Sequence, residues 1–99
     1  MIEKFETHND TFVCTEGTAF KDRIETSLAV LVDVFGDPHL DAGGGAYWGI
    51  RFPDGELATV YNYTRYADGD CPVWNIGGND GKVVSRIKRL IKWRGYYVD

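Results

Sequence analysis

The residues best suited to bind a small molecule gather in one stretch, from residue 47 to residue 78. Aromatic rings and amide side chains recur there, and such groups combine flat apolar surface with polar tips. We predict that a nucleotide-like base stacks on, and hydrogen-bonds to, Tyr47, Trp48, Tyr61, Asn62, Tyr63, Trp74 and Asn75. An alternative stays open, because the aromatics alternate with small or polar residues as in half-buried strands, which would make at least half of them core.

A glycine-rich segment at the end of this stretch is suited to an anion. It precedes a predicted helix, and backbone N–H groups at a helix start favour phosphate. The predicted phosphate contacts are Gly77, Gly78, Arg86 and Arg89. The segment lacks the Gly-Lys-Ser/Thr ending of a Walker loop and does not match GxGxxG. A plain strand-to-helix connection, with Asn79 or Asp80 as N-cap, is the alternative interpretation.

No catalytic or metal-binding motif accompanies these residues. His39 has the acidic neighbours Asp37 and Asp41, but acidic turns of this kind are common on surfaces. No Cys/His spacing matches a zinc site, and no serine has a histidine partner nearby in sequence. We therefore predict a non-enzymatic protein without catalytic residues, a bound metal or a cofactor.

Composition narrows the class of protein. A chain of 99 residues with 43% hydrophobic content is expected to form one globular domain, with residues 1–11 as a loosely held arm or short edge strand. Neither a signal peptide nor an apolar run of about 20 residues is present, so we expect no membrane span. Cys14 and Cys71 are expected to be reduced thiols, because small secreted frameworks usually carry four or more cysteines. The expected location is cytoplasmic.

Charge is unevenly distributed. Residues 1–80 carry −9 and residues 81–99 carry +5, for a net charge of −4. The basic segment could contact phosphates, or it could be a helix whose cations suit the negative end of its own dipole and its acidic neighbours. We favour the helix and expect nucleic acid not to be the partner, because the overall acidity repels a polyanion at long range.

Two helices are predicted to frame the binding stretch. The apolar spacing from Phe20 to Phe35 predicts a helix over 19–35, with Thr18 as N-cap and Gly36 at its end. A second apolar stripe predicts a helix over 80–93. Its basic residues lie mostly off the stripe, and Gly95 follows its end.

Four strands are predicted, over 12–15, 47–52, 57–63 and 73–76, with loops at 39–46 and 66–72. The order strand, helix, three-stranded meander, helix predicts an α+β two-layer domain. Its small antiparallel sheet, the meander plus the N-terminal strand, carries both helices on one face. The expected core comprises Leu28, Leu31, Phe35, Ile50, Val60, Ile87 and Leu90.

Four segments resemble, in the same order, a family of small uncharacterised bacteriophage and prophage proteins. They are LVDVFGDP at 31–38, WGIRFPDG at 48–55, ATVYNY at 58–63 and WNIGG at 74–78. The similarity covers roughly residues 12–91 and brings no catalytic residues to carry over. Members of that family often have His after the paired glycines, where this chain has Asn79.

The resemblance implies a phage-infected bacterium as the setting. We expect an accessory protein that counters host antiviral defence by sequestering a nucleotide-like immune signal, in a pocket at a homo-oligomer interface. One alternative is a protein-directed, anti-CRISPR-like inhibitor of a host defence nuclease, whose acidic surface mimics phosphate charge. Others are a nucleic-acid-binding protein that uses the C-terminal basic helix, and a hydrolase of cyclic nucleotides.

Overall fold

A computed structural model describes residues 4–40, 45–62 and 73–98. Within these ranges the strands are β1 (Glu6–Thr7), β2 (Ala19–Glu25), β3 (His39–Leu40), β4 (Ala46–Arg51), β5 (Leu57–Asn62) and β6 (Val73–Gly78). The helices are α1 (Leu28–Phe35) and α2 (Lys82–Trp93). Neither is long and apolar enough to cross a membrane. The predicted loop at 66–72 lies outside the described residues, as do Tyr63 and residues 41–44. The predicted loop at 39–46 is wrong at both ends, because residues 39–40 pair with β4 as β3 and β4 begins at Ala46.

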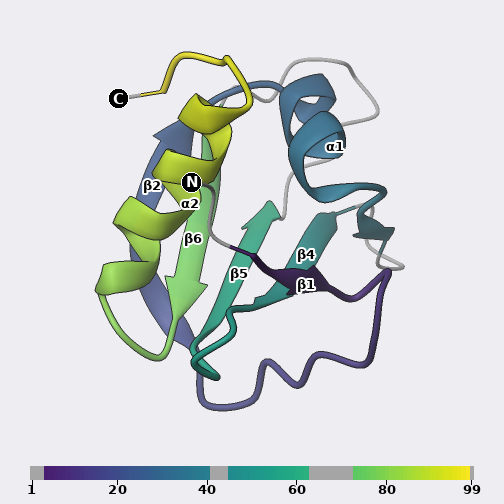
Figure 1. Ribbon diagram of the computed structural model, residues 1–99, viewed down its shortest axis with the longest axis vertical. Helices are drawn as coiled ribbons and strands as arrows, with labels where there is room; N and C mark the ends of the chain where they lie inside the picture. The colour runs from purple at the N-terminus through teal and green to yellow at the C-terminus, as the bar shows by residue number, and fades with distance from the viewer. Residues whose placement is uncertain (1–3, 41–44, 63–72, 99) are drawn as a thin grey trace.

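The described strands form one antiparallel sheet with the order β1-β4-β5-β6-β2, and β3 also pairs with β4 (Figure 1). Strands β4, β5 and β6 are the predicted meander. Its register sets Tyr47 opposite Tyr61, and Tyr61 opposite Asn75. The aromatic and amide residues of neighbouring strands therefore lie side by side.

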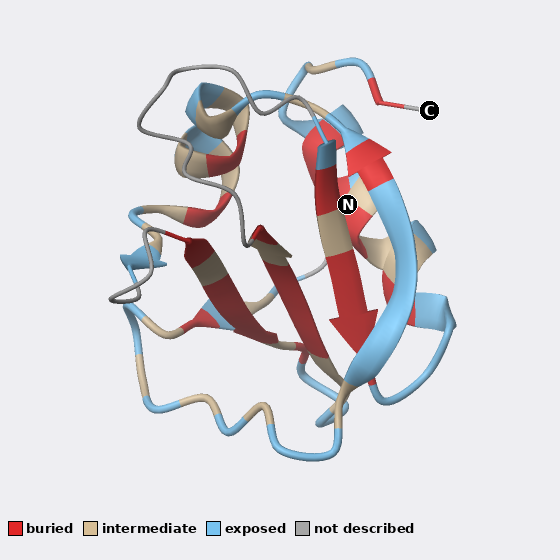
Figure 2. Ribbon diagram, turned by 180° about the vertical axis from the view of Figure 1, so that it is seen from behind, coloured by how far each residue is buried: buried red, intermediate tan, exposed pale blue. Residues whose placement is uncertain are grey.

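Both helices pack on one face of this sheet (Figure 1), and they contact each other. Figure 2 shows the opposite face, which no helix covers and which we call the outer face. The predicted α+β two-layer architecture is therefore confirmed.

The N-terminal elements differ from the prediction. Residues 12–15 form no strand, and the predicted helix over 19–35 is wrong in its first half, because residues 19–25 are β2. Backbone pairing with β6 along the whole of β2 replaces the helical hydrogen bonds there. Apolar residues four apart, such as Phe20 and Ile24, fit a helix, but of the residues of β2 only Ile24 is buried.

Helix α1 starts nine residues later than predicted, and Ser27 rather than Thr18 is its N-cap. The Ser27 backbone is extended, and its hydroxyl accepts a hydrogen bond from the Val30 N–H at 3.2 Å. The predicted end at Gly36 is confirmed: this residue has φ 87°, which favours glycine, and its N–H donates to the Val32 carbonyl. In α2 the N-cap is Gly81, which makes no side-chain cap hydrogen bond, so the prediction of Asn79 or Asp80 as N-cap is wrong. The Asp80 carboxylate, one residue earlier, accepts a hydrogen bond from the Lys82 N–H at 2.9 Å.

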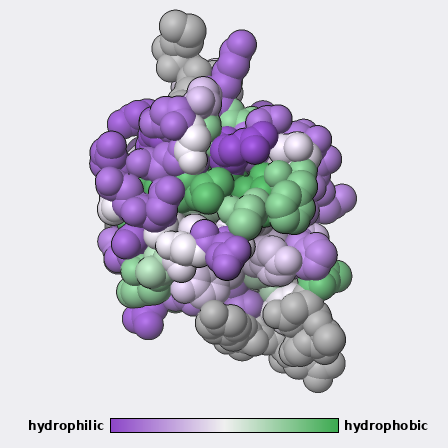
Figure 3. Space-filling view, turned by 90° about the horizontal axis from the view of Figure 1, so that it is seen from below, coloured by the Kyte–Doolittle hydropathy of each residue, from purple (hydrophilic) through white to green (hydrophobic). Residues whose placement is uncertain are grey.

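The connection from β1 to β2 runs along the lower end of the molecule in Figure 1, and Figure 3 shows hydrophobic residues gathered across that end. In this connection Phe12 is 82% exposed, and at the start of β2 Phe20 is 51% exposed. Val13 and Thr15 pass over Gly49 on the outer face, where a Cβ would lie 3.3–3.4 Å from their side-chain carbons. The connection thus covers one part of the outer face.

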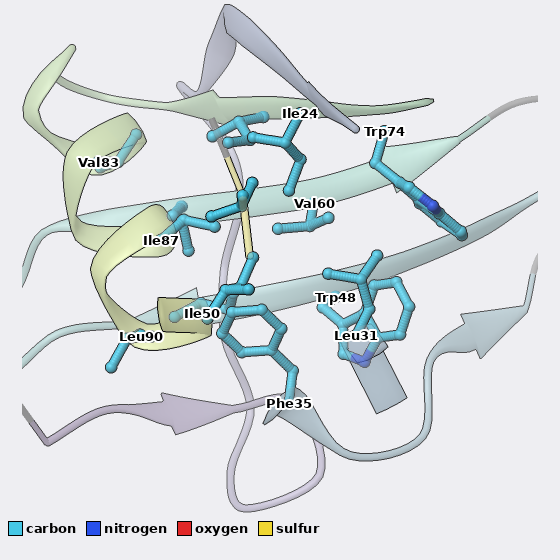
Figure 4. Packing of buried hydrophobic residues seen from close by; sticks show 14 of the residues in the cluster. Ile24, Leu31, Phe35, Trp48, Ile50, Val60, Trp74, Val83, Ile87 and Leu90 are labelled. Carbon is cyan, nitrogen blue, oxygen red and sulfur yellow. The ribbon is translucent and has the colours of Figure 1, made fainter. Parts of the chain in front are cut away.

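The core lies between the sheet and the two helices. Leu31 and Phe35 of α1, and Ile87 of α2, point at Trp48, Ile50 and Val60 of the sheet (Figure 4). Six of the seven predicted core residues are buried there, and Leu28 is half-buried against the cluster.

Candidate ligand-binding site

Strand alternation sorts the predicted ligand contacts onto two faces, because successive side chains of a strand point to opposite sides. The inward residues include Trp48, Asn62, Trp74 and Gly78. The outward ones are Tyr47, Tyr61, Asn75 and Gly77, which are paired across β4, β5 and β6. The structure therefore brings four of the predicted contacts together on the outer face, while Tyr63 lies outside the described residues.

Trp48 and Trp74 belong to the core. Both side chains are fully buried, and their rings pack edge to face at 5.4 Å between centroids. The Trp48 indole N–H donates to the Gly36 carbonyl at 2.8 Å, which ties β4 to the end of α1. Neither ring has a surface on which a ligand could stack. Asn62 is also buried, and its amide donates to the Val73 carbonyl at 3.3 Å, but it lies at the end of β5 and lines the pocket described next.

A pocket of about 370 Å³ opens on the outer face, and we call it the outer-face pocket. Three aromatic rings line it: Tyr47 of β4, Tyr61 of β5 and Phe20 of β2. The hydroxyl-bearing side chains of Thr15 and Thr18, from the connection before β2, also line it. Flat apolar surface and hydrogen-bonding groups therefore face the same space.

Thr59 and Gly77 meet inside this pocket. They are opposite each other in the β5–β6 pairing, and a Cβ on Gly77 would lie 2.5 Å from the Thr59 Oγ1. Thr59 is 8% exposed, yet its hydroxyl makes no hydrogen bond with any described residue. The hydroxyl is not enclosed, however: it faces the pocket, where water or a ligand can reach it and form hydrogen bonds with it.

The other predicted phosphate contacts do not face the pocket. Gly78 lies against Val83 of α2, where a Cβ would meet the Val83 side chain at 2.5 Å. Arg86 forms two hydrogen bonds with the Asp54 carboxylate, at 3.0 and 2.9 Å, and a third with Glu56 at 3.1 Å. Its guanidinium also lies over the Phe52 ring. Arg86 therefore holds the β4–β5 turn to α2, and it lowers the pKa of Asp54 by hydrogen bonding.

A histidine pair adjoins the pocket at the β4 edge. The His39 ring lies 4.8 Å from the Tyr47 ring and 6.1 Å from the His8 ring, between centroids. Burial lowers the pKa of His8, and the nearby His39 adds to this effect, while the Asp37 carbonyl and the Asp10 carboxylate oppose it. The His8 Nδ1 is buried and accepts no hydrogen bond from the described residues. Both imidazole rings therefore pack against the Tyr47 ring.

Sequence reasoning missed Phe20 and Arg23, because it placed both on a helix. In β2 the pairing register shifts between Phe20 and Asp22, so Phe20 pairs with Gly77 and Arg23 with Asn75. Gly77 and Asn75 are two residues apart and share the outer face, so Phe20 and Arg23 share it too. No pattern of period two in the sequence would have revealed this, since residues three apart in a regular strand point to opposite faces.

Within the described ranges, no group of three or more His, Cys, Asp or Glu side chains is arranged to hold a metal ion. Comparison of the chain with protein-family models, with curated proteins and with solved structures gives no match. The resemblance to bacteriophage accessory proteins therefore stays a prediction from the four sequence segments.

Proposed function

We propose that the protein is a non-enzymatic binding protein that holds a small, nucleotide-like molecule in the outer-face pocket. In the phage-infected bacterium that the sequence resemblance implies, holding such a molecule would withdraw a nucleotide signal from host antiviral defence. The cytoplasm of the host cell is the corresponding location.

The observation that carries the proposal is the Thr59 hydroxyl, nearly buried and without a hydrogen-bond partner in the described chain. A hydroxyl that faces a pocket can exchange hydrogen bonds with a polar ring edge of a nucleobase, in place of the water that otherwise reaches it. Gly77 supports this interpretation, because its missing side chain leaves room above the strand where the hydroxyl lies.

The paired tyrosines supply the second half of a base-binding site. Tyr47 and Tyr61 are directly opposite each other on β4 and β5, and both line the pocket. Aromatic rings that stack on a base are worth about 1–3 kcal/mol per base by alanine substitution. The rings of Tyr47 and Tyr61 and the hydroxyl of Thr59 line the same pocket, which favours a flat heterocycle over an aliphatic ligand.

Isothermal titration calorimetry tests the proposal. The wild-type protein is titrated with nucleosides, 5′-monophosphates, cyclic mono- and dinucleotides and ADP-ribose. For the compound that binds, we expect Tyr61→Ala to weaken affinity about 5- to 150-fold. Thr59→Val keeps the side-chain shape and removes the hydroxyl, and we expect it to weaken affinity about 2- to 10-fold.

A pair of glycine variants provides the control. Gly77→Ala places a methyl group where the Thr59 hydroxyl lies and should abolish binding, whereas Gly81→Ala adds the same methyl group in open space and should leave binding unchanged. Thermal unfolding shows whether each variant folds. A wild-type protein that binds no member of the panel would overturn the proposal, and a protein-directed inhibitor would then become the better hypothesis.

A further inference from the structure

We propose that Arg23 binds the anionic group of the ligand, so that the outer-face pocket selects phosphorylated nucleosides over free nucleosides. This inference rests on the proposed function and names the chemical class of the ligand. It also moves the phosphate contact from α2, where the sequence predicts it, to β2.

The irregularity in β2 is the first observation. Without the register shift between Phe20 and Asp22, Phe20 and Arg23 would lie on opposite faces of the sheet. With it, both lie on the outer face, Phe20 beside Gly77 and Arg23 beside Asn75. Bulges of this kind are frequent next to functional sites, where they redirect one side chain, and here the redirected side chain is a cation.

Two contacts hold the Arg23 guanidinium against the outer face. Its Cζ lies 5.5 Å from the centroid of the Phe20 ring, and Phe20 lines the pocket. Its Nε–H donates to the Asn75 side-chain oxygen at 3.3 Å. Asn75 is in turn paired with Tyr61, a second residue that lines the pocket. The guanidinium thus lies on the outer face beside Phe20, which lines the pocket on the β2 side, although Arg23 is exposed and is not itself part of the pocket lining.

Arg23 forms no ion pair with any of the described residues. Arg51, Arg86 and Arg94 differ, because they pair with Glu6, with Asp54 and Glu56, and with Asp33, respectively. The nearby Asp22 carboxylate accepts from the backbone N–H of Arg23 at 2.8 Å. Both terminal nitrogens of Arg23 therefore remain able to donate to a ligand.

The chemistry of these free donors favours a phosphate. A guanidinium offers planar, paired N–H groups that match two oxygens of one phosphate, and it stays charged at every physiological pH. A base stacked on Tyr47 and Tyr61 would direct its sugar-linked phosphate either toward β2 or away from it. On the β2 side the phosphate meets Arg23.

A matched pair of ligands tests this inference. The affinity of a nucleoside and of its 5′-monophosphate is measured by calorimetry for the wild type, Arg23→Gln and Arg89→Gln. Arg89 is exposed on α2 and, like Arg23, forms no ion pair within the described chain, so its loss removes the same charge elsewhere. We expect the wild type to bind the monophosphate more tightly than the nucleoside. In Arg23→Gln the ratio of these two affinities should fall by about 10-fold or more.

Thermal unfolding shows whether Arg23→Gln is folded, and its nucleoside affinity should fall less than its monophosphate affinity. A wild type that binds nucleoside and monophosphate equally, an Arg23→Gln variant that keeps the wild-type preference, or an equal loss in Arg89→Gln would overturn the inference while leaving base binding intact. If neither ligand of any pair binds the wild type, the proposed function itself fails, and the inference fails with it.

Discussion

Single residues decide which aromatic groups of this chain can meet a ligand. Tyr47 and Trp48 are neighbours in sequence, yet the first lines the outer-face pocket and the second is fully buried. Alternation along the strand predicts that they face opposite ways, and the larger, more apolar indole is the one that fills the core. Sequence alone could not tell how much of the outward side stays open, because this depends on where residues 12–18 run.

A second residue-scale feature is the missing side chain of Gly77, which leaves room for the Thr59 hydroxyl on the neighbouring strand. From the sequence, the paired glycines are predicted to contact phosphate at the start of a helix. In the structure Gly77 and Gly78 serve opposite faces, one making room in the pocket and the other making room for Val83. Only the pairing of β5 with β6 separates these two roles.

His8 should make the folded state sensitive to acid. Burial holds its pKa below the ordinary value of 6.5, so the unfolded chain binds a proton more readily than the folded protein does. Stability is therefore full above that value and is lost as the pH falls from 6.5 toward the lower folded-state pKa. Urea unfolding at pH 8 and pH 5.5 should show this loss in the wild type and a smaller loss in His8→Gln.

His39→Gln is the matched control for His8, because it removes the other imidazole of the pair. Burial is the largest cause of the His8 shift, and the charge of His39 is a lesser one. Most of the acid-induced loss should therefore remain in this variant. An undiminished loss in His8→Gln would show that another group is responsible.

At the scale of elements, the meander and α2 could be predicted from the sequence, because each element buries one face and its apolar residues therefore recur with a regular period. Strands β4 to β6 and α2 lie within a few residues of their predicted limits. Strand β2 was not readable, because five of its residues before Ile24 are exposed and carry no strand-like alternation. Its conformation is set by pairing with β6, a partner that local propensity does not include.

Helix α1 offers a direct test of the core. Leu31 of α1 is fully buried in the core cluster, so Leu31→Ala should lower the free energy of unfolding by roughly 2–5 kcal/mol. Leu28→Ala, the same substitution on the same helix at a half-buried position, should cost less. Chemical denaturation of both variants provides the comparison. A loss below about 1 kcal/mol for Leu31→Ala would contradict the packing described here.

At the scale of the whole molecule, exposed apolar side chains support the prediction of self-association. Phe12 and Tyr97 are 82% and 84% exposed, and Figure 3 shows hydrophobic residues across the end that carries the β1–β2 connection. Exposed apolar patches commonly mark interfaces between proteins. Sedimentation at micromolar concentration should therefore show a homodimer or a larger closed assembly.

Phe12→Ser should shift that assembly toward the monomer, because it removes the most exposed apolar group of the connection. Tyr97→Ser tests in the same way an exposed side chain that follows α2. Phe12 does not line the pocket, so ligand binding can be followed in the same variant. A wild type that sediments solely as an 11.2 kDa species would contradict self-association and the idea of a pocket at an interface.

The pairing of β2 with β6 has a consequence for the time at which the protein becomes able to bind. The residues joined in this pairing are between 48 and 59 positions apart, from Glu25 with Val73 to Ala19 with Gly78. During synthesis β2 leaves the ribosome long before β6 exists, and contacts of such high sequence separation form slowly. Phe20 joins the pocket lining, and Arg23 comes to lie beside it, only when this pairing forms, so the pocket of the proposed function is complete only in the finished sheet.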